Sequence, residues 1–132
     1  MIYLDSCALV KLVSPAPETG ALERYLRDHA SEHHVASALV RTEVRRALAR
    51  IGATARQQST ADKLLDTVIT ISITDELLDA AGRLEDPGLR SLDAIHLATA
   101  VHLGTGLSQF VTYDRRLLSA ARGAGLATAA PH

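Results

Sequence analysis

The sequence predicts an α/β fold, built from a small parallel sheet of four to five strands with helices on both of its faces. Short apolar runs rich in β-branched residues alternate with longer segments whose apolar residues recur at helical spacing. This alternation indicates parallel strands, because the chain must cross over through a helix before the next strand can pair. With 132 residues, 47% of them hydrophobic, the chain can form one core. We therefore expect a single domain over residues 1–132.

The first strand is expected at Ile2–Leu4, an apolar run followed at once by Asp5 and Ser6. Ser6 has the side chain of a helix N-cap and is expected to begin a short helix that ends at Val13. Apolar spacing and charge distribution predict three more helices and one more strand in this half of the chain. They are a helix starting at 17–19, a strand over 33–36, a helix capped by Ser37 that ends near Ile51, and a helix over about 55–65.

The second half of the chain continues the alternation of strand and helix. Alternating β-branched residues predict a strand over 68–73, and the other elements follow from caps and apolar spacing. These are a helix capped by Thr74 that ends near Leu84, a helix capped by Ser91 that ends at Leu103, a strand over 109–112, a helix from Asp114 to about Gly123, and a short edge strand over 126–128.

Composition narrows the classes of function. Cys7 is the only cysteine, so a disulfide framework is excluded, which is typical of a reducing cytoplasm. Polar residues interrupt the longest apolar stretch, and the start lacks the basic region of a signal peptide. We therefore expect a cytoplasmic protein with no membrane partner. The net charge of −1 does not indicate a nucleic-acid-binding protein, and an aromatic content of 3% argues against extensive base stacking.

Four acidic residues stand out by position, namely Asp5, Glu43, Asp93 and Asp114. Three lie at strand ends or helix starts, which share one edge of a parallel sheet, and ligands bind at that edge. Gathered carboxylates repel one another unless a cation is present. Oxygen ligands without accompanying Cys or His select Mg²⁺ or Mn²⁺ over zinc. We expect all four to be catalytic, with Asp5, Asp93 and Asp114 as metal ligands. The glutamate would be a further ligand or would orient the attacking water.

Each of these acids also has an ordinary structural explanation. Asp93 and Asp114 can interact favourably with helix dipoles, and Asp5 can cap a turn. Glu43 can form a surface ion pair with Arg46, which is three residues further along the same helix. All of these explanations must hold together if the chain has no metal site.

Four other polar side chains near these acids have two interpretations each. Ser6 and Thr112 are expected either to support the site through hydroxyl hydrogen bonds or to cap a helix and pack in a strand. His96, three residues after Asp93, is expected to be hydrogen-bonded and semi-buried rather than in contact with substrate. Cys7 is expected to be a small buried helix residue rather than a nucleophile, because no histidine adjoins it in the sequence.

Basic residues gather in one predicted helix, at Arg41, Arg45, Arg46 and Arg50. The planar guanidinium group can bind two phosphate oxygens at once, which favours phosphate recognition. A solvated helix face explains the same pattern. The charge pattern leaves both interpretations open.

Four stretches of the chain carry a resemblance to a known family: MIYLDSCALVKL, ASALVRTEVRRAL, SLDAIHLATA and FVTYDRRLLSAA. In order and spacing they resemble the PIN-domain family, and most closely its VapC-type toxin ribonucleases. The resemblance covers nearly the whole chain. The combination of the four stretches is far more specific than any one of them.

This resemblance implies a small parallel sheet flanked by helices and a Mg²⁺-dependent endoribonuclease activity. It further implies the toxin of a type II, VapBC-type toxin–antitoxin system, which cleaves RNA and inhibits translation and growth. The family's metal-binding acids correspond to the four acids above, none of which is replaced, and its hydroxyl residues correspond to Ser6 and Thr112. A small VapB-type antitoxin and homodimerisation are also implied, and the arginines would contact RNA or that antitoxin.

Two other functions compete with this interpretation. A non-catalytic PIN-like module that binds RNA or protein is disfavoured by the intact set of acids. A phosphoacceptor receiver domain, also a small α/β fold, requires paired acids after the first strand and a lysine after the last one. Here Asp5 alone follows the first strand, and no lysine follows the last.

Overall fold

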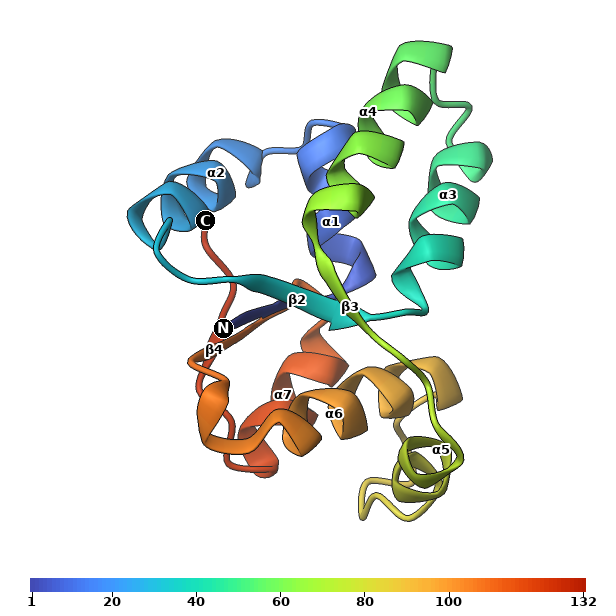
Figure 1. Ribbon diagram of the computed structural model, residues 1–132, viewed down its shortest axis with the longest axis vertical. Helices are drawn as coiled ribbons and strands as arrows, with labels where there is room; N and C mark the ends of the chain where they lie inside the picture. Colours follow the sequence, from blue (N-terminus) through green and yellow to red (C-terminus); the bar gives the residue numbers. More distant parts are fainter.

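The computed structural model describes residues 1–132 and arranges them as seven α-helices around a five-stranded sheet (Figure 1). In chain order the elements are β1 (Ile2–Leu4), α1 (Ser6–Val13), α2 (Thr19–Asp28), β2 (His34–Ser37), α3 (Val40–Arg50), α4 (Ala55–Thr67), β3 (Ile69–Ile71), α5 (Asp75–Gly82), α6 (Ser91–Leu103), the 3₁₀ turn η1 (Gly104–Gly106), β4 (Gln109–Val111), α7 (Arg115–Gly123) and β5 (Thr128–Ala129).

The sheet has the strand order β3-β2-β1-β4-β5, and every neighbouring pair is parallel. The central strand β1 pairs with both β2 and β4, so that Tyr3 lies opposite Val35 on one side and Phe110 on the other. This arrangement confirms the predicted parallel α/β fold with five strands.

Helices cover both faces of the sheet because its side chains alternate between them. Ile2 and Leu4 are fully buried on the face covered by α1 to α4, whereas Tyr3 is fully buried on the opposite face with α6 and α7. In Figure 1, α1 to α4 lie on one side of the strands and α5 to α7 on the other. None of the helices is long and apolar enough to cross a membrane.

The start of α1 differs from the sequence prediction. Asp5, and not Ser6, is the N-cap, and its Oδ1 accepts a hydrogen bond from the Ala8 N–H at 2.9 Å. An ionised carboxylate forms a stronger bond to a helix N-terminus than a hydroxyl does. The prediction that Ser6 caps this helix is therefore wrong.

Two other predicted serine caps are also wrong. Ser37 remains in β2, and its hydroxyl accepts from the Leu39 N–H at 3.2 Å in the turn that precedes α3. Ser91 is the first residue of α6, and Arg90 occupies the N-cap position without a side-chain hydrogen bond. The caps of α5 and α7, Thr74 and Asp114, are confirmed. The final strand begins at residue 128 rather than 126.

Candidate active site

The predicted site residues lie where the chain leaves the sheet at the carboxyl ends of its central strands. Asp5 directly follows β1, and Thr112 and Asp114 follow β4, which pairs with β1 up to Leu4 opposite Val111. From β1 the chain continues to β2 on one side, whereas β4 and β5 occupy the other side. This is the topological switch point of the sheet, and open α/β sheets bind their ligands in the crevice formed there.

Asp5 is held rigidly at this switch point. Its carboxylate is only 3% exposed and accepts hydrogen bonds from the Ala8 N–H, from the Cys7 thiol at 2.9 Å and from the Thr112 hydroxyl. Burial raises the pKa of Asp5, and the hydrogen bonds from Cys7, Thr112 and Ala8 counteract part of that rise. Both carboxylate oxygens are therefore fixed in direction by the protein.

Asp93 is the carboxylate most affected by the other acids. It lies in the first turn of α6, is partly buried and makes no hydrogen bond through its side chain. Its pKa is raised first by burial and then by the negative charge of Asp114, with smaller contributions from Asp5 and Glu43. The other three predicted acids therefore all act electrostatically on Asp93, although they come from different parts of the chain.

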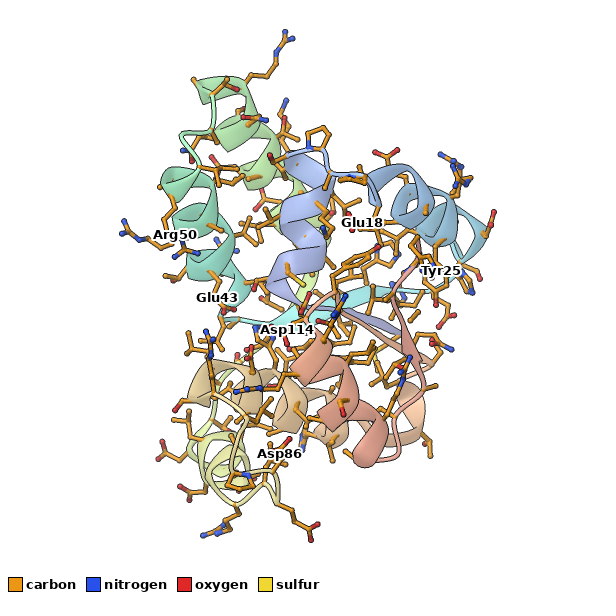
Figure 2. The ribbon with its side chains drawn as sticks, turned by 180° about the vertical axis from the view of Figure 1, so that it is seen from behind. Glu18, Tyr25, Glu43, Arg50, Asp86 and Asp114 are labelled. Carbon is orange, nitrogen blue, oxygen red and sulfur yellow. The ribbon has the colours of Figure 1, made fainter.

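Glu43 and Asp114 complete the set, and Figure 2 shows both near the carboxyl edge of the sheet, at the ends of α3 and α7 closest to it. Glu43 lies in the first turn of α3, and its Oε1 is 2.6 Å from Nε2 of His96. Asp114 is the N-cap of α7, and its Oδ1 accepts from the Leu117 N–H at 2.9 Å. Each of these acids keeps one oxygen free of hydrogen bonds within the chain.

The donor set has the chemistry that a hard divalent cation requires. Asp93 offers two uncommitted oxygens, and Glu43 and Asp114 offer one each. A cation among them would remove the repulsion that raises the pKa of Asp93. No three Asp, Glu, His or Cys side chains are already arranged as a metal-binding cluster. The assignment of Asp5, Asp93 and Asp114 as metal ligands therefore stays a prediction.

A groove lies between α1 and α3, and Glu43 is the one of the four acids that lines it. It has a volume of about 690 Å³ and includes Glu43, Ser6, Lys11, Arg46 and Arg50 in its walls. The Ser6 hydroxyl makes no hydrogen bond within the chain, so it is available to a ligand. The acidic end and the basic wall of one groove suit a ligand that carries phosphates next to a bound cation.

The four arginines of α3 have different surroundings. Arg46 and Arg50 line the groove, and Figure 2 shows Arg50 at the end of α3 far from Glu43. Arg45 instead bonds to Asp62 of α4 through Nε at 3.1 Å and Nη2 at 3.0 Å. Arg41 is exposed outside the groove wall. The structure thus places two of the four predicted arginines in the wall of the groove that Glu43 also lines.

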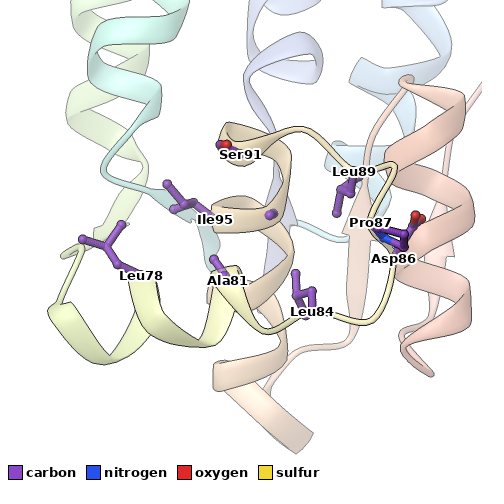
Figure 3. Close-up of a pocket in the computed structure, with 10 residues that line it drawn as sticks. Leu78, Ala81, Leu84, Asp86, Pro87, Leu89, Ser91 and Ile95 are labelled. Atoms are coloured by element: carbon purple, nitrogen blue, oxygen red, sulfur yellow. The ribbon is translucent and has the colours of Figure 1, made fainter.

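A second hollow lies away from the acids, between α5 and the start of α6 (Figure 3). Its walls are mainly apolar, with Leu78, Leu84, Leu89 and Ile95 among the lining residues, and Asp86 is the only ionisable group. It contains a single carboxylate and no set of metal ligands. The groove at the switch point is therefore the better candidate for an active site.

Comparison with known proteins identifies the family of the chain. The model of the family described as PIN domain matches residues 2–123. The chain belongs to the PIN-domain family. Ribonuclease VapC46 of Mycobacterium tuberculosis is 46% identical over 130 residues, covering 98% of this chain and 97% of that protein. Ribonuclease VapC47 of the same species is 41% identical over 133 residues, with 99% and 97% covered. The resemblance to VapC-type ribonucleases is thereby confirmed.

Solved structures show the same fold at low sequence identity. The Mycobacterium tuberculosis toxin VapC20, described as cleaving the sarcin-ricin loop, aligns with a TM-score of 0.74 at 20% identity, covering 99% of this chain and all of that one. VapBC2 from Rickettsia felis, bound to a DNA fragment from its promoter, aligns with a TM-score of 0.74 at 20% identity, with 98% of both chains covered. A toxin–antitoxin complex from Klebsiella pneumoniae gives 0.71 at 21%, with 99% and 97% covered.

Two side chains of this PIN domain have contacts that the sequence did not reveal. His96 is hydrogen-bonded as predicted but is fully buried, and its partners are Glu43 and Tyr3. Cys7 bonds to Asp5, and burial together with the charge of Asp5 raises the pKa of its thiol to about 12. Cys7 is therefore a neutral hydrogen-bond donor to Asp5. It lies in α1 as expected, but it is partly exposed and lines the groove rather than being buried. The pattern of apolar residues in α6 gave no signal for the His96 contacts.

Proposed function

We propose that this PIN domain is a Mg²⁺-dependent endoribonuclease and the toxin of a VapBC-type toxin–antitoxin pair. The observation that carries this proposal is the gathering of acids near the switch point of the sheet, where burial and then the charges of Asp114, Asp5 and Glu43 raise the pKa of Asp93. The curated relatives named as VapC ribonucleases support RNA as the substrate. Cleavage of RNA inside the cytoplasm would inhibit translation and growth.

The four acids would have distinct roles. Asp93 and Asp114 would hold the cation through their free oxygens, and Asp5 would complete the negative site from the end of β1. Glu43 would use the oxygen that does not contact His96 as a ligand or to orient the attacking water. Mg²⁺, or Mn²⁺ in its place, lowers the pKa of a bound water and stabilises charge on the scissile phosphate.

Thr112 and Ser6 would support these groups. Thr112 donates its hydroxyl proton to Asp5 and accepts from the Asp114 N–H at 3.1 Å, so one side chain ties two of the acids together. Ser6 faces the groove next to Asp5 and would bind a phosphate oxygen. Neither residue would take part in proton transfer.

The basic wall of the groove would bind the RNA backbone. Arg46 and Arg50 face it, whereas Arg45 is engaged with Asp62. In a cleavage-deficient Asp93→Asn background, the double variant Arg46→Ala, Arg50→Ala should flatten the salt dependence of RNA affinity by about 0.7 per lost phosphate contact. Arg45→Ala is the matched control and should leave the slope unchanged. An unchanged slope in the double variant would argue that these arginines bind the antitoxin or face solvent.

A small antitoxin of the VapB type would be the protein partner, and the toxin would form a homodimer. The structural neighbours include toxin–antitoxin complexes, which supports the first of these assignments. The groove with its acidic end offers a site that such a partner can block. Co-expression with the reading frame next to the toxin gene, followed by light scattering of toxin and complex, tests both assemblies.

The central experiment compares RNA cleavage by the wild type, Asp5→Asn and Asp93→Asn in Mg²⁺ and in EDTA. Asparagine is as good an N-cap as aspartate. Because Asp5→Asn also replaces one acceptor of the hydrogen bonds from Thr112 and Cys7, each variant is checked for folding by circular dichroism before its activity is compared. Asp66→Asn, on the exposed face of α4, is the matched control for loss of one charge. We expect Mg²⁺-dependent cleavage by the wild type and the control only. Cleavage by either site variant at the wild-type rate contradicts the proposal, and RNA binding without cleavage by the wild type indicates a non-catalytic module.

A further inference from the structure

A buried chain of hydrogen bonds connects Glu43 to the centre of the sheet. The Ser37 N–H donates to the Tyr3 hydroxyl at 3.0 Å, and that hydroxyl is 2.6 Å from Nδ1 of His96. Nε2 of the same imidazole is 2.6 Å from Oε1 of Glu43. Tyr3 and His96 are at most 1% exposed, whereas the Glu43 side chain is 20% exposed and borders the groove. The chain thus runs from a dry core to the edge of the candidate active site.

The inner part of this chain is rigid. Tyr3 belongs to the central strand and stacks on Phe110, with ring centroids 4.9 Å apart and planes 12° apart. The His96 ring meets Tyr3 edge-on, with centroids 5.9 Å apart. Burial raises the pKa of Tyr3, so its hydroxyl keeps its proton. Because that oxygen already accepts from the Ser37 N–H, its own proton is available for Nδ1 of His96.

This arrangement orients the imidazole and is consistent with one tautomer, in which the Tyr3 hydroxyl donates to Nδ1. With Nδ1 as acceptor, Nε2 carries the proton and donates it to Glu43. A buried imidazole is costly unless its ring nitrogens are bonded, and here both nitrogens have partners. One oxygen of Glu43 is therefore fixed by the protein, and the other is left for a ligand.

We propose that His96 is a positioning residue that holds Glu43 in its working orientation, and that Tyr3 holds His96. This inference rests on the proposed nuclease function, in which Glu43 binds the cation or orients the attacking water. Residues that hydrogen-bond to a metal ligand and orient it contribute about 10–100-fold to metal affinity or activity. We expect a loss in that range when the contact between His96 and Glu43 is removed.

The test uses two substitutions of His96, one of Tyr3 and one control in the same helix. His96→Leu removes both hydrogen bonds, His96→Gln restores a donor toward Glu43, and Tyr3→Phe removes only the hydroxyl. His102→Leu changes an exposed histidine of α6 and is the matched control. Each variant is checked for folding by circular dichroism. Mn²⁺ affinity is then measured without RNA by electron paramagnetic resonance, and kcat and KM are measured on RNA.

We expect His96→Leu to lower Mn²⁺ affinity or kcat by about 10–100-fold with little change in KM. His96→Gln should recover part of the loss, Tyr3→Phe should be intermediate, and the control should match the wild type. In a Glu43→Gln background, His96→Leu should add no further loss, because the group that it positions is already gone. A further loss of equal size in that background, or wild-type values for folded His96→Leu, overturns the proposal.

Nitrogen NMR of the wild-type imidazoles provides a reading that needs no variant. We expect His96 to carry its proton on Nε2, with an Nε2 signal that changes in Glu43→Gln; a proton on Nδ1 alone overturns the role of Tyr3. If the wild type cleaves no RNA, the nuclease proposal fails. The NMR spectra and the Mn²⁺ affinities still decide whether His96 positions Glu43, so the two failures are distinguishable.

Discussion

Thr112→Val should destabilise the fold in a pH-dependent way. Thr112 is fully buried, and its hydroxyl donates to Oδ2 of Asp5 while accepting from the Asp114 N–H. Valine has nearly the same shape and lacks the hydroxyl, so the substitution deletes both hydrogen bonds without leaving a cavity. A hydrogen bond to a charged group contributes about 1.5–3 kcal/mol. We therefore expect the free energy of unfolding at neutral pH to fall by about 2–3 kcal/mol.

The pH dependence follows from the pKa of Asp5. Burial raises this pKa above its unfolded value, and the hydrogen bond from Thr112 is one of the contacts that limit the rise. Without it, the folded-state pKa moves further up. A carboxyl with a raised folded pKa contributes stability below its unfolded pKa and loses that contribution as the pH rises through the folded value. The stability gap between wild type and Thr112→Val should therefore be smaller in acid, where the lost bond from the Asp114 N–H still contributes, and should widen as the pH rises.

Urea unfolding at several pH values between mildly acidic and neutral measures this gap. Thr112→Ser is the control, because it keeps the hydroxyl and loses one methyl group. That loss should cost about 1 kcal/mol and should not depend on pH. A constant gap for Thr112→Val across the pH range, or an equally widening gap for Thr112→Ser, would refute the role assigned to this hydroxyl.

Three further predictions concern the metal, the core and a helix cap. Saturating Mg²⁺ at about 100 times its Kd should stabilise the wild type by about 2.7 kcal/mol in thermal unfolding at neutral pH. This gain should shrink in acid, where the ligands are protonated, and be lost in Asp93→Asn. Leu48→Ala, in the fully buried face of α3, should cost about 2–5 kcal/mol in urea unfolding. Thr54→Ala removes the capping box with Gln57 and should cost about 1 kcal/mol by the same measurement.

The course of the backbone could be predicted well because it depends on local patterns. The apolar run Ile2–Leu4 and the β-branched run that contains β3 are strands, and α6 ends at Leu103 as predicted. The wrong caps do not share one cause. At α1 the Asp5 carboxylate replaces Ser6 as the cap, whereas the N-cap residues of α3 and α6, Leu39 and Arg90, make no side-chain hydrogen bond.

The location of the acids could also be predicted, whereas the directions of the arginines could not. Carboxyl ends of parallel strands share one edge, so Asp5 and Asp114 had to meet once the strands were known. Arg45 and Arg46 are neighbours in the sequence, yet one faces α4 and the other faces the groove. Their directions depend on how α3 packs against α1 and α4, and on the presence of Asp62. No local pattern contains that information.

The contact between His96 and Glu43 joins residues 53 positions apart, and it depends on the packing of α6 against the sheet. The hydrogen bonds that hold His96 in this contact begin at Tyr3 in β1, the strand that Asp5 directly follows. Tyr3 points to the face covered by α6 and reaches His96, while Asp5 extends from the carboxyl end of the strand to Thr112. Because neighbouring residues of a strand point to opposite faces, a register shift of one residue would withdraw Tyr3 from His96 and move Asp5 at the same time. The register of β1 against β2 and β4 therefore determines the position of Asp5 directly. It determines the position of Glu43 indirectly, through the side chains of Tyr3 and His96.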